Sequence, residues 1–124
     1  RQRQMCIRDR DKAYYVADFV MNGFDTRVWF TPDAEWVMKQ TDWETLDEVP
    51  AAVFNAFAAS EFSDGVVQNV TWVQFPEWQP IVAIQVGKPN MQMKYQILFT
   101  PKGEVLRQQN ITNAYNTLGA STFL

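Results

Sequence analysis

Four acidic side chains lie close together between positions 42 and 48, and carboxylates are groups that catalyse hydrolysis or bind calcium. They are Asp42, Glu44, Asp47 and Glu48. Their spacing does not match a calcium-binding EF-hand loop. They precede a predicted helix, and negative charge near a helix N-terminus is stabilising. We interpret the acidic run as a feature of the helix start, with calcium binding or a catalytic carboxylate pair as the alternative.

Other common catalytic side chains are missing from the sequence. It has no histidine, which excludes His-based acid–base catalysis, Ser-His-Asp triads and most zinc sites. The single cysteine, Cys6, lies in an atypical N-terminal segment, and no serine lies in a nucleophile-elbow motif. The five glycines do not cluster, so no phosphate-binding loop is expected. We predict a protein that is not an enzyme and that has no cofactor or metal site.

The first ten residues, RQRQMCIRDR, differ in composition from the remainder. They carry a net charge of +3, whereas the other 114 residues hold 7 basic and 13 acidic residues, a net charge of −6. An acidic body argues against nucleic-acid binding, which depends on clustered Lys and Arg. No apolar run reaches the roughly 18 residues that a membrane-spanning helix needs. We predict that residues 1–10 are a non-native or disordered tail.

The hydrophobic pattern of residues 11–124 predicts one α+β domain. Alternating and β-branched runs predict strands, and Asn22-Gly23 is a strong signal for a two-residue hairpin turn. Val53, Phe54 and Phe57 recur at helical spacing after Pro50. The predicted strands span 14–21, 24–30, 35–40, 66–74, 81–86, 91–99 and 104–108; the predicted helix spans 49–60, and 75–80 is a loop.

The chain also contains an internal repeat. Residues 30–40 and 99–109 share five identical residues at an offset of 69. This similarity predicts one supersecondary unit used twice. The second unit, 45–110, comprises the helix and four strands. The first, 11–44, shows strands only and is interpreted as truncated. Together they predict an antiparallel sheet with a helix packed on one face.

The candidate binding surface follows from the faces of the predicted strands. Trp29 shares a face with Asp25 and Arg27, opposite the presumed core, and Leu98 is its counterpart in the repeat. Trp78 lies between two prolines in the 75–80 loop. Exposed aromatic residues are typical of protein interfaces; the alternative is that they pack inside. We expect Trp29→Ala and Trp78→Ala to weaken partner binding and leave stability nearly unchanged. The predicted surface consists of Arg27, Trp29, Trp78, Lys94, Gln96 and Leu98.

Two motifs resemble a known family. Pro50-Ala51-Ala52-Val53 opens the predicted helix, and Tyr95, Phe99, Gly103 and Leu106 form a Tyr-x-x-x-Phe-x-x-x-Gly-x-x-Leu pattern. In this order they resemble the PepSY-like family, also described as beta-lactamase-inhibitor-protein-like (BLIP-like), over about residues 13–109. The resemblance implies a periplasmic or secreted bacterial protein, often from Bacteroidetes, without established catalytic activity. The inhibitor binds its enzyme across an open sheet face, but its paired cysteines are absent here.

These observations lead to three hypotheses about function. The first is a non-catalytic binding module that presents its open sheet face and the 75–80 loop to a protein or envelope polymer. The second is a structural or stabilising envelope domain without a discrete ligand, in which the tryptophans would be buried. The third is a carboxylate-based hydrolase, which requires two carboxylates roughly 5–10 Å apart in a cleft. The identity of the partner and the oligomeric state are left open.

Overall fold

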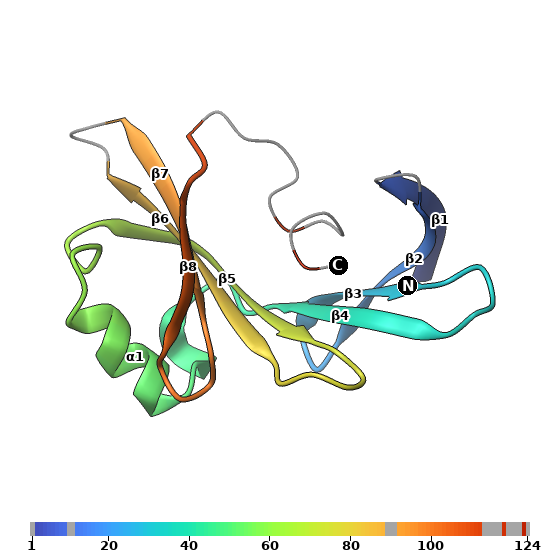
Figure 1. Cartoon of the computed structure of the whole chain (residues 1–124), viewed down its shortest axis with the longest axis horizontal. Coiled ribbons are helices and arrows are strands. Elements are labelled where there is room, and N and C mark those ends of the chain that lie inside the picture. The colour runs from blue at the N-terminus through green and yellow to red at the C-terminus, as the bar shows by residue number, and fades with distance from the viewer. Residues whose placement is uncertain (1, 10–11, 89–91, 113–117, 119–122, 124) are drawn as a thin grey trace.

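All the strands of the described chain belong to one antiparallel sheet (Figure 1). The computed structural model describes residues 2–9, 12–88, 92–112, 118 and 123. Its eight strands lie in sequence order, so each pairs with the next along the chain. Strands β1–β4 and β5–β8 occupy opposite ends of the molecule (Figure 1). The strands are β1 Gln2–Asp9, β2 Lys12–Met21, β3 Phe24–Phe30, β4 Trp36–Asp42, β5 Val66–Gln74, β6 Ile81–Lys88, β7 Met93–Phe99 and β8 Val105–Asn110.

The predicted strands, the 75–80 loop and the hairpin turn are confirmed, with small shifts of the strand ends. Asn22 and Gly23 have φ angles of 54° and 85°, which a type I′ turn requires, and Met21 pairs with Phe24 across the turn. The two-residue turn sets the register of the whole β2–β3 ladder. It brings Asp18 opposite Arg27.

The N-terminal segment is a point of correction. We expected residues 1–10 to lie outside the fold, but the backbone of Gln2–Asp9 forms β1 and pairs with β2. Without β1, β2 would be the edge strand of the sheet and would have unpaired backbone groups, which a neighbouring strand can satisfy whatever its side chains. That residues 1–10 are not native stays a prediction.

The helical region begins with a short 3₁₀ helix, η1 Leu46–Glu48, and continues with α1 Ala51–Ala58. The Thr45 hydroxyl accepts a hydrogen bond from the Asp47 backbone N–H at 3.3 Å, so it caps η1 and not the α-helix. Pro50 occupies the N-cap position of α1. The predicted helix 49–60 is therefore confirmed in position but is shorter than expected. Asp47 and Glu48 lie in the first turn of η1, in agreement with the helix-start interpretation of the acidic run.

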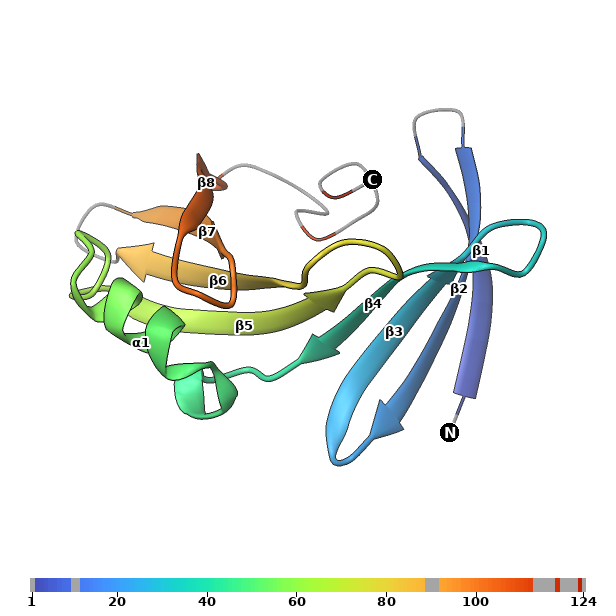
Figure 2. The same cartoon turned by 60° about the horizontal axis from the view of Figure 1, so that its bottom comes forward.

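Figure 2 shows α1 on one face of β5 and β6. Val53 and Phe57 of α1 and the following Phe62 join one hydrophobic core, to which the sheet contributes Val70, Val82, Ile84, Val86, Ile97 and Phe99. Trp43 and Trp72 stack at its margin with ring centroids 5.0 Å apart. A helix packed on one face of the sheet is thus confirmed.

The opposite side of the sheet, which we call the open face, carries a second core. Tyr14, Val16, Trp29, Met38, Val73, Ala83 and Leu98 gather there with Phe123 from the end of the chain. Leu118 packs against the same cluster, and its backbone carbonyl accepts a hydrogen bond from Gln40 Nε2. The open face is therefore partly covered, whereas the sequence analysis assumed that only one face was apolar.

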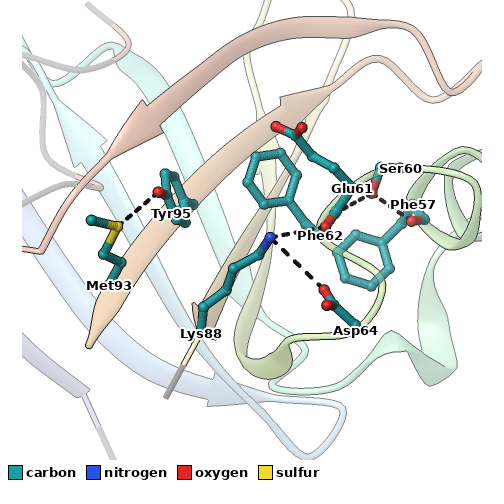
Figure 3. A network of polar contacts seen from close by, with 8 residues as sticks. All are labelled: Phe57, Ser60, Glu61, Phe62, Asp64, Lys88, Met93 and Tyr95. Carbon is teal, nitrogen blue, oxygen red and sulfur yellow. Dashed lines mark hydrogen bonds and ion pairs between the residues drawn. The ribbon is translucent and has the colours of Figure 1, made fainter. Parts of the chain in front are cut away.

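The connection from α1 to β5 is fastened to the end of β6 (Figure 3). Lys88 Nζ donates a hydrogen bond to the Glu61 carbonyl at 3.0 Å and lies 3.8 Å from the Asp64 carboxylate. The same ammonium group lies 5.3 Å from the centre of the Phe62 ring. Tyr95 packs against Phe62 with ring centroids 5.1 Å apart. These contacts hold the end of the helical region against β6 and β7.

Candidate functional site

The open face contains a hollow of about 630 Å³ in its N-terminal half. Strands β2, β3, β4 and β5 form its floor, and Leu118 lies at one side. The residues that line it are Asp18, Phe19, Val20, Asp25, Thr26, Arg27, Trp29, Gln40, Asp42, Asn69, Thr71 and Leu118. A concave site with an aromatic floor and converging polar groups is the usual form of a ligand-binding site.

The strand registers explain how distant residues meet in this hollow. Asp18 pairs with Arg27, and Arg27 pairs with Gln40, so one row of polar side chains crosses β2, β3 and β4. A second row is formed by Asp42 and its cross-strand partner Thr71. Side chains directly opposite each other on neighbouring antiparallel strands lie close enough to interact.

Arg27 is the central cation of the hollow. Its Nε donates to Asp18 Oδ1 at 2.5 Å, and its Nη2 donates to Asp18 Oδ2 at 3.3 Å. The guanidinium carbon lies 5.9 Å from the centre of the Trp29 ring. The forked pair and the ring hold Arg27 in one orientation, which makes it part of a preorganised surface.

Asp42 is a partly buried carboxyl group in the lining of the hollow. Partial burial raises its pKa above the usual range, and the nearby charges of Glu44 and Asp25 raise it further. A hydrogen bond from the Glu44 backbone N–H to Oδ1, at 3.1 Å, opposes this effect. The carboxylates of Asp25, Asp42 and Glu44 thus lie near one another, and the Asp42 carboxyl group loses its proton less readily than a solvated one.

The position of Trp29 is the main correction to the sequence analysis. We expected its ring on an exposed face, but it is 2% exposed and belongs to the open-face core with Val16 and Met38. The error arose because alternation along a strand cannot show that both faces are covered. The expectation that Trp29→Ala leaves stability unchanged is withdrawn for the same reason.

The residues predicted on the second unit are also less accessible than expected. Leu98 is 4% exposed within the open-face core, and Gln96 is fully buried. The Gln96 side-chain oxygen accepts a hydrogen bond from Gln85 Nε2 at 2.9 Å. Of this group only Lys94 is exposed. Arg27 and Lys94 therefore keep the predicted accessibility, and Gln96 and Leu98 do not.

Trp78 lies where the sequence placed it. It is 69% exposed in the loop between β5 and β6, and its ring centroid lies 5.9 Å from that of Phe75. Beside it is a second, more apolar hollow of about 530 Å³, which Tyr14, Val37 and Phe123 also line. Trp78 does not line the larger hollow, so the predicted surface is divided between two places.

Some of the lining residues were missed from the sequence. Asp18 could have been found, since the two-residue turn at Asn22-Gly23 dictates that it faces Arg27. Gln40, Thr71 and Leu118 come together only through the pairing of β4 with β5 and through the return of the chain end. No local sequence pattern predicts either of these contacts.

The described part of the chain contains no group of three or more His, Cys, Asp or Glu side chains able to hold a metal ion. Within the same residues, no helix has the length and apolarity needed to cross a membrane.

Comparison with solved structures identifies close relatives. A candidate periplasmic protein from Bacteroides eggerthii is 93% identical with a TM-score of 0.92; the match covers 98% of this chain and 86% of that one. A DUF2874 family protein from Bacteroides uniformis is 67% identical with a TM-score of 0.90, again over 98% and 86% of the two chains. A BLIP-like protein from Bacteroides fragilis is 28% identical with a TM-score of 0.78, over 92% and 78%.

No family model and no curated protein sequence matches the chain. The similarity to the BLIP-like protein supports the predicted BLIP-like fold. The high identity to the Bacteroides uniformis protein, over most of both sequences, assigns the family directly: this chain belongs to the DUF2874 family.

Proposed function

We propose that this protein is a non-catalytic binding module of the bacterial envelope that binds a protein or envelope polymer on its open face. The observation that carries the proposal is the hollow of about 630 Å³ formed by β2 to β5. The Asp18–Arg27 pair and the Asp42 carboxylate provide polar groups on paired strands, beside the Trp29 ring. A site on paired strands needs little reorganisation when a ligand binds.

The descriptions of the relatives support the proposed compartment. The Bacteroides eggerthii protein is described as a candidate periplasmic protein, and the Bacteroides fragilis protein as BLIP-like. A location in the periplasm or outside the cell is therefore part of the proposal. Binding through the sheet face is the mode that the BLIP-like resemblance implies.

Affinity capture from a Bacteroides envelope extract tests the proposal. The bait is the wild-type chain beside Asp25→Arg, which places a long cation in the hollow, and Asp33→Arg, a matched charge reversal in the β3–β4 turn outside it. We expect the wild type and Asp33→Arg to retain the same partner and Asp25→Arg to lose it. Equal capture by all three would refute binding through the hollow.

A carboxylate-based hydrolase is the second candidate, and one observation favours it. Asp25 and Asp42 line the same hollow, and the raised pKa of Asp42 suits a general acid. Incubation with purified envelope glycans and peptidoglycan, followed by mass spectrometry, distinguishes the two functions. Turnover that is lost in Asp42→Asn would establish the hydrolase, whereas binding of a glycan without hydrolysis products would support the binding module.

We also propose that the chain contains two copies of one four-stranded unit. In support, each of the five residue pairs between β3 and β4 recurs between β7 and β8 at an offset of 69, including the bulge after Trp29 and after Leu98. The connecting turns agree as well. The Thr31 N–H donates to the Glu35 carbonyl at 2.8 Å, and the Thr100 N–H donates to the Glu104 carbonyl at 2.8 Å.

The two copies differ in the helix that covers them. In the second, Val82 and Phe99 are a cross-strand pair that is fully buried in the core beneath α1. The corresponding pair in the first is Tyr15 and Phe30, and Tyr15 is 41% exposed. This difference supports a first unit that lacks its helix in this chain. The proposal also takes residues 1–10 to be a non-native segment at the place of the native first strand.

The longer Bacteroides eggerthii relative provides the test, since 14% of its length lies outside the match. If the first unit has a helix, the residues equivalent to Tyr15 and Phe30 should be protected from covalent surface labelling in that protein and accessible in this chain. Equal labelling in both proteins would refute the truncated tandem.

The two motifs noted in the sequence also support kinship with the PepSY-like family. Pro50 opens α1, Phe99 is fully buried, and Gly103 has a φ angle of 88° that suits glycine. The test is the strand register of a solved PepSY-like structure, which should match that of β5–β8 around α1.

A further inference from the structure

The hollow on the open face carries an excess of negative charge. Among the described lining residues are three carboxylates, Asp18, Asp25 and Asp42, and one cation, Arg27. Arg27 is engaged by Asp18 through two hydrogen bonds. Within the described residues no Lys or Arg forms an ion pair with Asp25 or Asp42. The described lining residues therefore sum to a formal charge of −2, and the two carboxylates without a described cation partner, Asp25 and Asp42, belong to β3 and β4.

Part of this negative charge lies on a partly desolvated carboxylate. Asp42 loses hydration through burial, and it also faces the charges of Asp25 and Glu44. Charges in a concave region with low-dielectric walls interact more strongly with a ligand than charges on a flat, solvated surface. A cation that enters the hollow would relieve the repulsion between Asp25 and Asp42.

The walls of the hollow add an apolar component. Trp29 forms part of the floor, and Val20 and Leu118 lie at the sides. Lysine and arginine side chains combine an apolar stem with a charged head, so a single such side chain can use both components. A divalent metal ion is a poorer fit, because the described residues hold no group of three possible metal ligands.

We infer that the hollow binds a lysine or arginine side chain presented by a protein partner, with Asp25 and Asp42 receiving its charge. This inference rests on the proposed binding function of the open face and names the chemistry of its ligand. Asn69 lines the same hollow and is partly exposed, so its side-chain carbonyl can accept a hydrogen bond from the backbone of the same segment, while its Nδ2 donates to the buried Thr71 hydroxyl at 3.2 Å. An anionic polymer is disfavoured by the same charges.

Peptide titration followed by NMR tests the inference on the complete chain. The probe is acetyl-Gly-Lys-Lys-Gly-amide, and the reference is the same peptide with both lysines Nε-acetylated. The indole N–H of Trp29 and the backbone signals of Asp25 and Asp42 report on the hollow. We expect saturable shifts of these signals with the charged peptide, at least tenfold weaker binding of the acetylated peptide, and weaker binding at high salt.

Matched variants locate the effect. Asp25→Asn with Asp42→Asn keeps the shape of the side chains and removes the charge, and Asp33→Asn removes an exposed carboxylate outside the hollow. We expect the double variant to bind the charged peptide at least tenfold more weakly and Asp33→Asn to bind it like wild type. Equal binding of the charged and acetylated peptides, or no shift of the Trp29 indole, would overturn the inference.

Failure of the inference can be separated from failure of the proposed function. If an envelope partner captured through the hollow binds the double Asn variant as tightly as wild type, a basic side chain is not its ligand and the binding module stands. If the hollow contacts no partner in the envelope extract, the proposed function itself fails.

Discussion

Trp29→Ala is predicted to be among the most damaging single substitutions in this protein. The ring is 2% exposed and packs in the open-face core, where its cross-strand neighbours are Val16 and Met38. Removing a buried tryptophan leaves a cavity that neighbouring side chains fill only in part, at a cost of about 3–5 kcal/mol. In a chain of this size, that loss corresponds to a fall in Tm of roughly 10–20 °C.

The matched control is Trp78→Ala, which removes the same side chain from an exposed loop. Trp78 is 69% exposed, and its main ring contact is with Phe75. We expect this variant to lose less than about 1 kcal/mol. Urea denaturation monitored by circular dichroism measures both variants on one scale. Similar stabilities of the two variants would refute the assignment of Trp29 to the core and restore its interpretation as an interface residue.

Three further predictions concern the turns and the hollow. Gly103→Ala should destabilise the protein by roughly 1 kcal/mol more than Gly23→Ala in urea denaturation. Both residues have positive φ, but only at Gly103 would the added Cβ clash with α1, where it would lie 2.6 Å from the backbone carbonyl oxygen of Ala52. Equal losses of stability would contradict this packing. Ala34→Gly should raise the Tm and stabilise the protein by up to about 1 kcal/mol. Ala34 has a φ of 67° at the position that Gly103 occupies in the second turn, and positive φ suits glycine. A loss of stability would show that the alanine is not strained. Because the pKa of Asp42 is raised in the folded state, its ionised carboxylate destabilises the folded protein at neutral pH, and this cost disappears as the pH falls through that pKa. Asp42→Asn should therefore be more stable than wild type at neutral pH, and the difference in stability should shrink toward about pH 4. A difference that does not depend on pH would refute this prediction.

Strands β2 to β8, the hairpin turn and the helix position could be predicted from the sequence, because each depends on local spacing, whereas β1 was not predicted. The β2–β3 pairing follows from Asn22-Gly23, so even the Asp18–Arg27 contact was within reach. The exact helix start was not, since Thr45 caps a separate 3₁₀ turn before Pro50.

The burial of Trp29 and Leu98 could not be predicted, for a physical reason. Alternation along a strand separates two faces but does not show what covers each of them. The open-face core depends on residues near the end of the chain, Leu118 and Phe123, which follow a weakly patterned segment. As a result, three predicted interface residues, Trp29, Gln96 and Leu98, are buried, and Arg27 is the most exposed residue of its row.

Site-specific photo-crosslinking tests the central claim most directly. A benzophenone amino acid at Val20, which is exposed and lines the hollow, is compared with the same group at Leu106, which is similarly exposed but does not line it. Each variant is irradiated in an envelope extract and analysed by mass spectrometry. A binding module predicts one protein or polymer crosslinked at Val20 and not at Leu106. Equal crosslinking at both positions, or none at Val20, would contradict a binding site on the open face.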